Sequence, residues 1–235
     1  MKLKEFVSKP VKSILRPAYR GCQAWAMRNI QRDYSQSRET IAVREILGNR
    51  RTRGIFVEVG ANDGVTISTT LGLIKDGWSG WSIEANPAVY QKLVSNLFRF
   101  SKVRPVNVAI SPFRGKVRLF LGKEDPGGFY STISTEDSGW YQEHRGETFV
   151  EVDGLPITDF LTEHQVPARF DLLLIDAEGM DLEIIQTLDI SKHRPTLIIT
   201  EDYEPKNESK FKLLQSLGYQ FKRRVGCNTF WLFRE

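Results

Sequence analysis

The sequence predicts an α/β fold with a mostly parallel β-sheet, which ends in an antiparallel edge hairpin and follows a basic helical extension. Two observations predict it. From Ile55 onward, short apolar runs alternate with segments of helical periodicity, as in repeated strand–helix units. Near the C-terminus, two apolar runs flank a turn at Gly226, Cys227 and Asn228, the pattern of a hairpin. The 235 residues suit one large domain plus the extension, and no second full domain is expected.

The order of elements follows from these runs. The expected strands are 55–59, 81–84, 103–110, 170–175 and 196–200, with 219–225 and 229–233 forming the hairpin. The expected helices are 65–75, 87–99, 178–189 and 207–217. Residues 111–167 form an insertion with β-like segments at 116–121 and 148–152 and a short helix from Thr158, which we expect on the substrate side.

Residues 1–54 form the extension, and residues 55–235 form the domain. The extension carries 13 Lys and Arg against four Asp and Glu, a net +9, which leaves −5 for the rest of a chain of net charge +4. Because the positive charge lies outside the domain, nucleic acid is not an expected partner. Residues 1–20 form a basic amphipathic segment suited to peripheral contact with an anionic membrane, although a solvated or capping helix is the favoured reading. With no signal-peptide core or long apolar run, we predict a cytoplasmic location.

The strongest functional signal is the segment 56–64, Phe-Val-Glu-Val-Gly-Ala-Asn-Asp-Gly. An apolar strand runs into Glu58-x-Gly60-x-x-x-Gly64 and then into a helical segment. A glycine at position 60 lets the backbone turn sharply and a ligand approach closely, and Gly64 permits a tight path onward. The spacing lacks the Gly-x-Gly-x-x-Gly pattern of dinucleotide sites, which disfavours an NAD-binding or nucleotide-sugar oxidoreductase.

Two further acids end predicted strands. Glu84 follows Glu58 by 26 residues, at a strand end where a carboxylate can accept hydrogen bonds from two ribose hydroxyls. Asp176 ends the buried strand 170–175 and is followed by Glu178 and Asp181. Ligands bind at the carboxyl ends of strands in open α/β sheets, so Asp176 is expected to face the ligand. For Glu178 and Asp181 a favourable contact with the positive end of the next helix is at least as good an explanation.

From Ile55 onward the chain resembles the FkbM family of methyltransferases. The matching segments are Val57–Gly64, Ser82–Pro87, Asn107–Ser111, Leu174–Asp181 and Asn228–Trp231. The resemblance implies a Rossmann-like class I methyltransferase fold, S-adenosylmethionine as the methyl donor, and a hydroxyl acceptor on a sugar, glycan, glycolipid or specialised metabolite. It leaves the acceptor and the oligomeric state open.

The resemblance also implies roles for single residues. Glu58 and Gly60 would lie along the methionine part of the donor, Glu84 would bind the ribose, Asn107 to Ala109 would border the adenine, and Asp176 would lie near the sulfonium. The residues expected to bind the donor are Glu58, Gly60, Asn62, Asp63, Gly64, Glu84, Ala85, Asn107, Ala109 and Asp176.

A hydroxyl acceptor needs a group that takes up its proton. We assign Asp176 and His193 as catalytic residues, and His144 and His164 stay open as alternative bases. No metal ligands are assigned, although Asp176 together with Glu201 and Asp202 forms an alternative all-oxygen Mg²⁺ site. The two cysteines, Cys22 and Cys227, are expected to be free thiols without catalytic function.

The segment 126–133 is rich in glycine, aromatic and hydroxyl residues, a composition suited to a wall over a small-molecule or carbohydrate acceptor. A second class of function stays open. In that reading the chain is a non-catalytic binding or scaffold protein, which reaches a membrane or a partner through its basic arm.

Overall fold

The computed structural model describes residues 32–48, 53–123, 125, 127–133, 144–202 and 208–234. The predicted membrane contact through residues 1–20 lies outside this part of the chain, as does Cys22.

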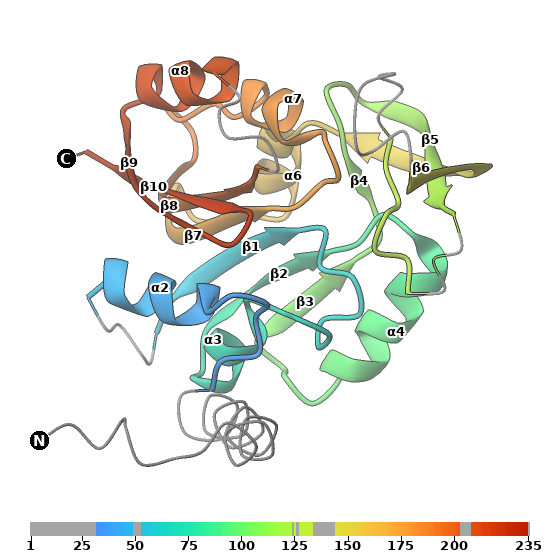
Figure 1. The fold of residues 1–235 in the computed structure, drawn as a ribbon, viewed down its shortest axis with the longest axis horizontal. Helices are drawn as coiled ribbons and strands as arrows, with labels where there is room; N and C mark the ends of the chain where they lie inside the picture. Colours follow the sequence, from blue (N-terminus) through green and yellow to red (C-terminus); the bar gives the residue numbers. More distant parts are fainter. Residues whose placement is uncertain are drawn as a thin grey trace, which may run out of the picture.

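A seven-stranded sheet forms the centre of the molecule (Figure 1). Its strand order is β3-β2-β1-β7-β8-β10-β9. The pairs from β3 to β8 are parallel, and β10 joins β8 and β9 in antiparallel register. The strands are β1 Ile55–Val59, β2 Ser79–Ile83, β3 Val103–Val106, β7 Arg169–Ile175, β8 Arg194–Glu201, β9 Tyr219–Val225 and β10 Asn228–Phe233. The predicted parallel sheet with a C-terminal antiparallel hairpin is therefore confirmed.

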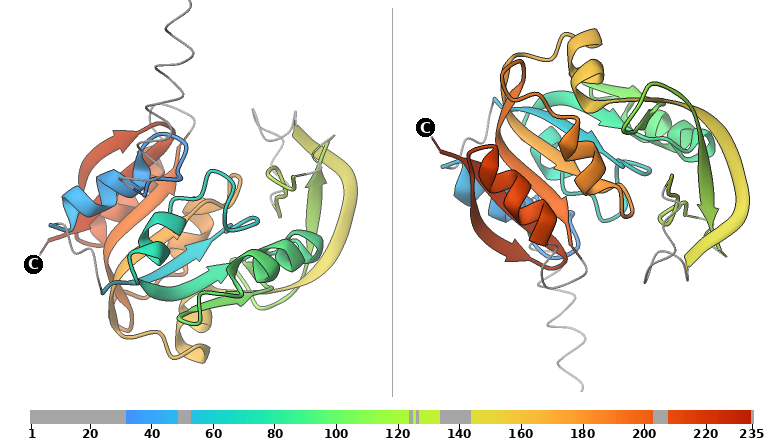
Figure 2. Two further views of the ribbon diagram at one scale, coloured as in Figure 1. Left: turned by 90° about the horizontal axis from the view of Figure 1, so that it is seen from below. Right: turned by 90° about the horizontal axis from the view of Figure 1, so that it is seen from above.

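A smaller sheet of order β4-β6-β5 stands beside the first. Its strands are β4 Ala109–Ile110, β5 Gly115–Gly122 and β6 Arg145–Leu155. In Figure 2 the β5–β6 hairpin curves away from the main body. The run 103–110, predicted as one strand, is divided in the structure because Ala109 and Ile110 pair with β6 rather than with the main sheet.

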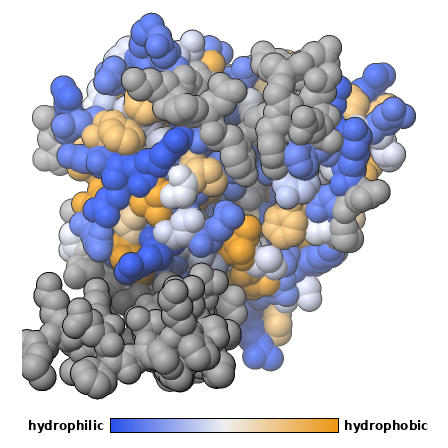
Figure 3. Space-filling view, in the orientation of Figure 1, coloured by the Kyte–Doolittle hydropathy of each residue, from blue (hydrophilic) through white to orange (hydrophobic). Residues whose placement is uncertain are grey.

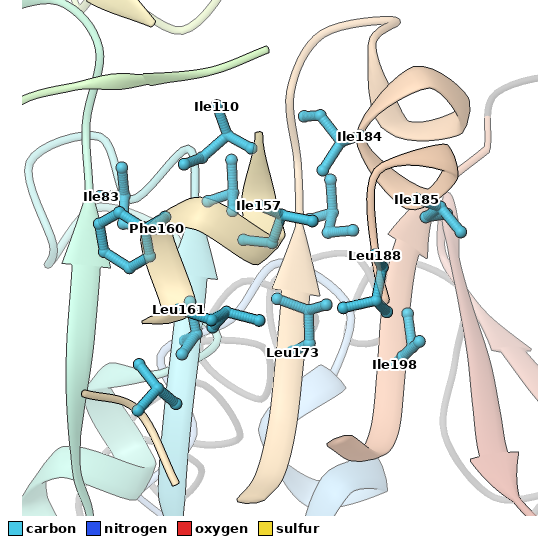
Figure 4. Close-up of a cluster of buried hydrophobic side chains, with 14 of the residues drawn as sticks. Ile83, Ile110, Ile157, Phe160, Leu161, Leu173, Ile184, Ile185, Leu188 and Ile198 are labelled. Atoms are coloured by element: carbon cyan, nitrogen blue, oxygen red, sulfur yellow. The ribbon is translucent and has the colours of Figure 1, made fainter. Parts of the chain in front are cut away.

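Helices cover both faces of the main sheet (Figure 1). On one face lie α2 Glu39–Ile46, α3 Leu71–Lys75 and α4 Pro87–Leu97, and on the other lie α6 Ile157–Glu163, α7 Asp181–Gln186 and α8 Glu208–Ser216. Alternation along the strands produces two apolar layers, because successive side chains point to opposite faces. Leu173 and Ile198, for example, pack under α6 and α7 (Figure 4), while Leu172 and Leu197 belong to the opposite cluster.

Two helices begin later than the sequence predicts. The predicted helix 65–75 starts only at Leu71, because Asp63 accepts the backbone N–H groups of Val65 and Thr66 and so replaces helical hydrogen bonds. The predicted helix 178–189 starts at Asp181. Glu178 (φ 49°) precedes it in left-handed conformation, so the chain turns at this point before the helix begins.

Helix α2 packs into the domain, although the sequence analysis placed it in the extension. Ala42, Val43 and Leu47 are buried in the same apolar cluster as α3 and α4. Arg44 forms an ion pair of 2.7 Å with Asp76, and both side chains are at most one-tenth exposed. The described part of the extension is thus a structural component of the fold.

On the face shown in Figure 3, hydrophobic residues form small patches between hydrophilic ones. None of the described helices is both long enough and apolar enough to cross a membrane. The cytoplasmic location stays a prediction.

Candidate active site

Four neighbouring strands deliver acidic side chains to one cleft at their carboxyl ends. Glu58 lies in β1, Glu84 follows β2, Asp176 follows β7, and Glu201 is the last residue of β8. The cleft encloses about 1100 Å³, part of which is open to solvent. Since the carboxyl ends of parallel strands meet at one edge of a sheet, the fold itself brings these residues together.

The turn after β1 depends on Gly60. Its φ of 79° lies in the left-handed region, and a Cβ atom there would stand 1.8 Å from the carbonyl oxygen of Asp176. The backbones of β1 and β7 therefore approach each other closely beside the cleft. Only glycine fits this position without moving one of the two strands.

The carboxylate of Glu58 is buried on the α3 side of the sheet. Its Oε2 accepts hydrogen bonds from the hydroxyls of Thr70 (2.7 Å) and Ser82 (3.3 Å). Burial raises the pKa of Glu58 to about 7, these two hydrogen bonds oppose the rise, and the charge of Glu84 adds to it. Glu58 consequently changes its protonation state near neutral pH.

Glu84 is held in place by backbone donors. Its two oxygens accept the N–H groups of Asn62 (2.9 Å) and Asn86 (2.8 Å). Burial raises the pKa of Glu84 to about 7 in spite of these hydrogen bonds. Asn86 also caps helix α4, since its Oδ1 accepts the N–H of Ala88 at 3.0 Å, so the start of α4 is fixed to the rim of the cleft.

Three carboxylates meet on the other side of Gly60. One oxygen from each of Asp176, Glu178 and Glu201 lies within 4.8 Å of the other two. Burial, followed by the charges of Glu201, Glu178 and Asp181, raises the pKa of Asp176 well above its usual value. Burial and the charges of Glu201, Asp181 and Asp125 raise the pKa of Glu178 to about 9. The cluster is therefore suited to hold a proton or a cationic group.

The metal site considered from the sequence has a different composition in the structure. Asp202 lies 3.4 Å from the buried ammonium group of Lys210 and does not line the cleft, so Glu178 takes its place beside Asp176 and Glu201. Asp181 has a structural function, because its two oxygens accept the N–H groups of Ala177 (3.2 Å) and Glu201 (2.8 Å).

Cys227 lies beside the same cluster, with its Sγ 3.4 Å from Oε1 of Glu201. Burial, the charge of Glu201 and the hydrogen bond to Glu201 raise the pKa of the thiol to about 12. A thiol with this pKa stays protonated at neutral pH, which agrees with the predicted lack of catalytic function.

The insertion supplies a wall of the cleft, at the segment predicted for this purpose. Gly128, Phe129, Ser131 and Ile133 line it. The wall is anchored on both sides, since the hydroxyl of Thr132 donates to the carbonyl oxygen of Glu178 (2.8 Å) and Nδ2 of Asn86 donates to Ser131 Oγ (3.3 Å).

Most of the residues predicted to bind the donor line this cleft. They are Glu58, Gly60, Asn62, Glu84, Ala85, Ala109 and Asp176. The other three support the cleft from outside. Asp63 orders the loop after β1, a Cβ on Gly64 would meet the Leu93 side chain at 2.6 Å, and Nδ2 of Asn107 donates to the carbonyl oxygen of Glu84 at 2.7 Å.

The structure does not bring His193 to the cleft, so its position does not support the predicted function as a base. His193 precedes β8, while the cleft lies at Glu201, the other end of this strand. Eight residues of β-strand span about 26 Å. Nε2 of His193 lies 3.2 Å from the hydroxyl of Thr162 at the opposite edge of the sheet.

Sequence reasoning missed the contribution of helix α2 and of the residues just before it to the site. Gln36 and Glu39 line the cleft together with Asn228, and Nδ2 of Asn228 donates to Oε1 of Glu39 at 3.3 Å. Asn228 lies in one of the matching segments, which could have indicated a place near the site. No comparable signal marks Gln36 or Glu39.

Comparison with known proteins agrees with this geometry. The model of the methyltransferase FkbM domain matches residues 58–221, well over half of the chain. No curated protein matches the sequence.

Among solved structures, methyltransferase FkbM from Methylobacillus flagellatus KT has a TM-score of 0.52 and 17% identity, with 86% of this chain and 49% of that chain covered. This chain therefore spans about half the length of that protein. The METTL16 methyltransferase domain has a TM-score of 0.50 and 14% identity, covering 93% and 81%. Fibrillarin from Aeropyrum pernix, in complex with natively bound S-adenosyl-L-methionine, has a TM-score of 0.43 and 12% identity, covering 82% and 74%.

Proposed function

This chain belongs to the FkbM family of S-adenosylmethionine-dependent methyltransferases, and we propose that it methylates a hydroxyl group of a sugar, glycan, glycolipid or specialised metabolite. One observation carries the proposal. The Gly60 turn and the carboxyl groups of Glu58, Glu84 and Asp176, from three adjacent strands, line a single cleft. The acceptor class rests on the family resemblance, and the anchored wall at Phe129 and Ser131 supports an acceptor on that side.

The residues of the cleft suit the donor. A carboxylate offers about four lone-pair positions, and the backbone N–H groups of Asn62 and Asn86 occupy two of those of Glu84. The other positions can accept the two hydroxyl protons of a ribose. The backbone of the Gly60 turn lines the cleft together with Glu58, where it can lie against the methionine part.

S-adenosylmethionine supplies a methyl group that its sulfonium has already activated for displacement. The protein has to align the acceptor and remove its proton, and alignment alone can lower a barrier by roughly 7–11 kcal/mol. We assign proton removal to the Asp176 cluster instead of His193. Burial and the neighbouring charges raise the carboxyl pKa values of this cluster, so its carboxylates bind the proton of an acceptor more tightly than ordinary ones do.

Titration calorimetry with S-adenosylhomocysteine tests the donor site. Glu84→Gln should weaken binding about 10- to 100-fold, because it removes the negative charge from the group that accepts the two ribose hydroxyls. Wild-type affinity should fall by up to about tenfold per pH unit as the pH drops below the Glu84 pKa of about 7, and the variant should show a flatter dependence. Glu147→Gln, at an exposed position, is the matched control. Equal affinities of all three proteins would contradict the proposal.

The acceptor requires a separate experiment, a screen of sugars, glycolipids and phenols with donor that carries a labelled methyl group. Transfer to an oxygen supports the proposal, and transfer to nitrogen only would overturn its acceptor class. Binding of the donor without transfer to any acceptor would favour the non-catalytic scaffold. Asp176→Asn should abolish transfer while donor binding stays measurable.

A further inference from the structure

A second groove lies at the opposite edge of the main sheet, where β1, β2 and β3 begin. Two adjoining hollows form it and share Ile55, Ser79, Lys102 and Arg104. The first also includes Trp81, Gln165 and Pro167, and the second includes Arg53 and Ser101. The hollows enclose about 580 and 1080 Å³, part of which is open to solvent. None of these residues lines the cleft described above.

The groove concentrates positive charge. Arg53, Lys102 and Arg104 are all exposed, and within the described part of the chain none of the three has a carboxylate within 4.0 Å. The carboxylates of Asp171 and Glu163 contact other groups instead of these cations. Asp171 accepts the backbone N–H of Ile55 at 2.9 Å, and Glu163 pairs with Arg114 at 2.6 Å. Three cations around one hollow favour an anionic ligand.

The indole of Trp81 provides an independent observation. Trp81 lines the groove and is only 7% exposed, and its buried Nε1–H has no acceptor among the described residues. A buried donor without an acceptor is costly, and an indole nitrogen can only donate. Arg104, the register partner of Trp81 on β3, places its guanidinium 5.3 Å from the centre of the ring. The residue with the unpartnered N–H therefore lies directly beside one of the cations of the groove.

We infer that this groove binds a phosphate group, with Arg104 and Lys102 contacting its oxygens and Trp81 donating a hydrogen bond to it. A phosphate offers negative charge for the cations of the groove and several acceptor oxygens for the N–H of Trp81. The phosphate can belong to a small phosphorylated molecule or to a lipid headgroup, since both present the same chemistry.

His164 provides a spectroscopic probe beside the groove. Burial lowers the pKa of His164, Glu163 raises it, and the charge of Arg104 lowers it. An anion bound at Arg104 would offset this last effect, so the pKa of His164 should rise when inorganic phosphate or pyrophosphate is added to the full-length protein. The chain has three histidines, which makes the proton NMR titration tractable. An unchanged pKa of His164 at saturating pyrophosphate would overturn the inference.

Variants of the full chain locate the effect. Lys102→Gln/Arg104→Gln should weaken pyrophosphate binding at least tenfold in calorimetry, and Trp81→Phe, which keeps an aromatic ring and removes the N–H, about tenfold. Lys212→Gln/Lys222→Gln removes the same charge from exposed positions outside the groove and is the control. Loss of binding only in the groove variants supports the site. An equal loss in the control, or no loss in Lys102→Gln/Arg104→Gln, refutes it. If Trp81→Phe proves unstable, Lys102→Gln/Arg104→Gln still tests the site, because it changes only exposed side chains.

Vesicles distinguish the two sources of phosphate. The wild type and both double variants are sedimented with phosphatidylcholine vesicles that contain phosphatidate or lack it. A loss specific to Lys102→Gln/Arg104→Gln assigns the groove to a lipid headgroup. Unchanged sedimentation together with lost pyrophosphate binding assigns it to a soluble phosphorylated ligand. Binding of S-adenosylhomocysteine should be equal in all variants, so this inference and the proposed function can fail separately.

Discussion

Replacement of Glu58 by glutamine should stabilise the protein at alkaline pH and have little effect at acid pH. The folded protein holds the pKa of Glu58 at about 7, against 4.5 for an ordinary glutamate. A raised pKa in the folded state means that the folded protein binds the proton more tightly than the unfolded chain. Stability therefore declines as the pH rises from about 4.5 to about 7, and the loss is complete above that range. At 1.36 kcal/mol per pKa unit, the ionised carboxylate costs about 3 kcal/mol.

Glutamine removes this cost, because it carries no charge and its carbonyl oxygen can still accept from Thr70 and Ser82. Urea unfolding, followed by tryptophan fluorescence between pH 4 and 9, measures the difference from wild type. We expect about 3 kcal/mol at pH 8.5 and near zero at pH 4, while Glu147→Gln shows no trend. A difference that is the same at all pH values would refute the reasoning, since it would come from packing and not from ionisation.

Three further outcomes are expected. Gly60→Ala should destabilise the fold by about 3 kcal/mol or more and abolish binding of S-adenosylhomocysteine, because the added Cβ would stand 1.8 Å from the carbonyl oxygen of Asp176. Unaltered binding in calorimetry would show that the turn adapts. Asp76→Asn should lower the free energy of unfolding in urea by about 3 kcal/mol, because it leaves the buried charge of Arg44 uncompensated. A decrease below about 1 kcal/mol would mean that this ion pair contributes no more than a surface ion pair. His193→Gln should leave methyl transfer unchanged in the labelled-donor assay, and a large loss would return His193 to the mechanism.

The main sheet could be predicted because its strands are apolar and separated by segments of helical periodicity. The close approach of Glu58, Glu84 and Asp176 followed from the same pattern, since parallel strands bring their carboxyl ends to one edge. The same rule argues against His193, which precedes its strand. The chemistry of an imidazole predicts a base, but the direction of β8 places His193 at the far end of the strand.

Other features depend on tertiary contacts that leave no periodic signal. The pairing of Ala109 with Gly154 on β6 divides a continuous apolar run. The left-handed conformation of Glu178 turns a residue expected at a helix end into a wall of the cleft. Glu39 reaches the site because α2 packs against the strands of the main sheet. The apolar pattern of a helix predicts that one of its faces is buried, but it does not predict against which strands.

The two edges of the sheet differ in charge, and this difference separates the donor cleft from the proposed phosphate groove. Carboxyl groups from β1, β2, β7 and β8 gather where these strands end, and burial favours the protonated forms of Glu58, Glu84 and Asp176 unless a cation approaches. A donor with a sulfonium and an ammonium group supplies such a cation. Lys102 and Arg104 gather where β3 begins, beside the indole N–H of Trp81. Because the two sites use opposite charges on opposite edges, a phosphorylated ligand in the groove should not compete with the donor for the cleft.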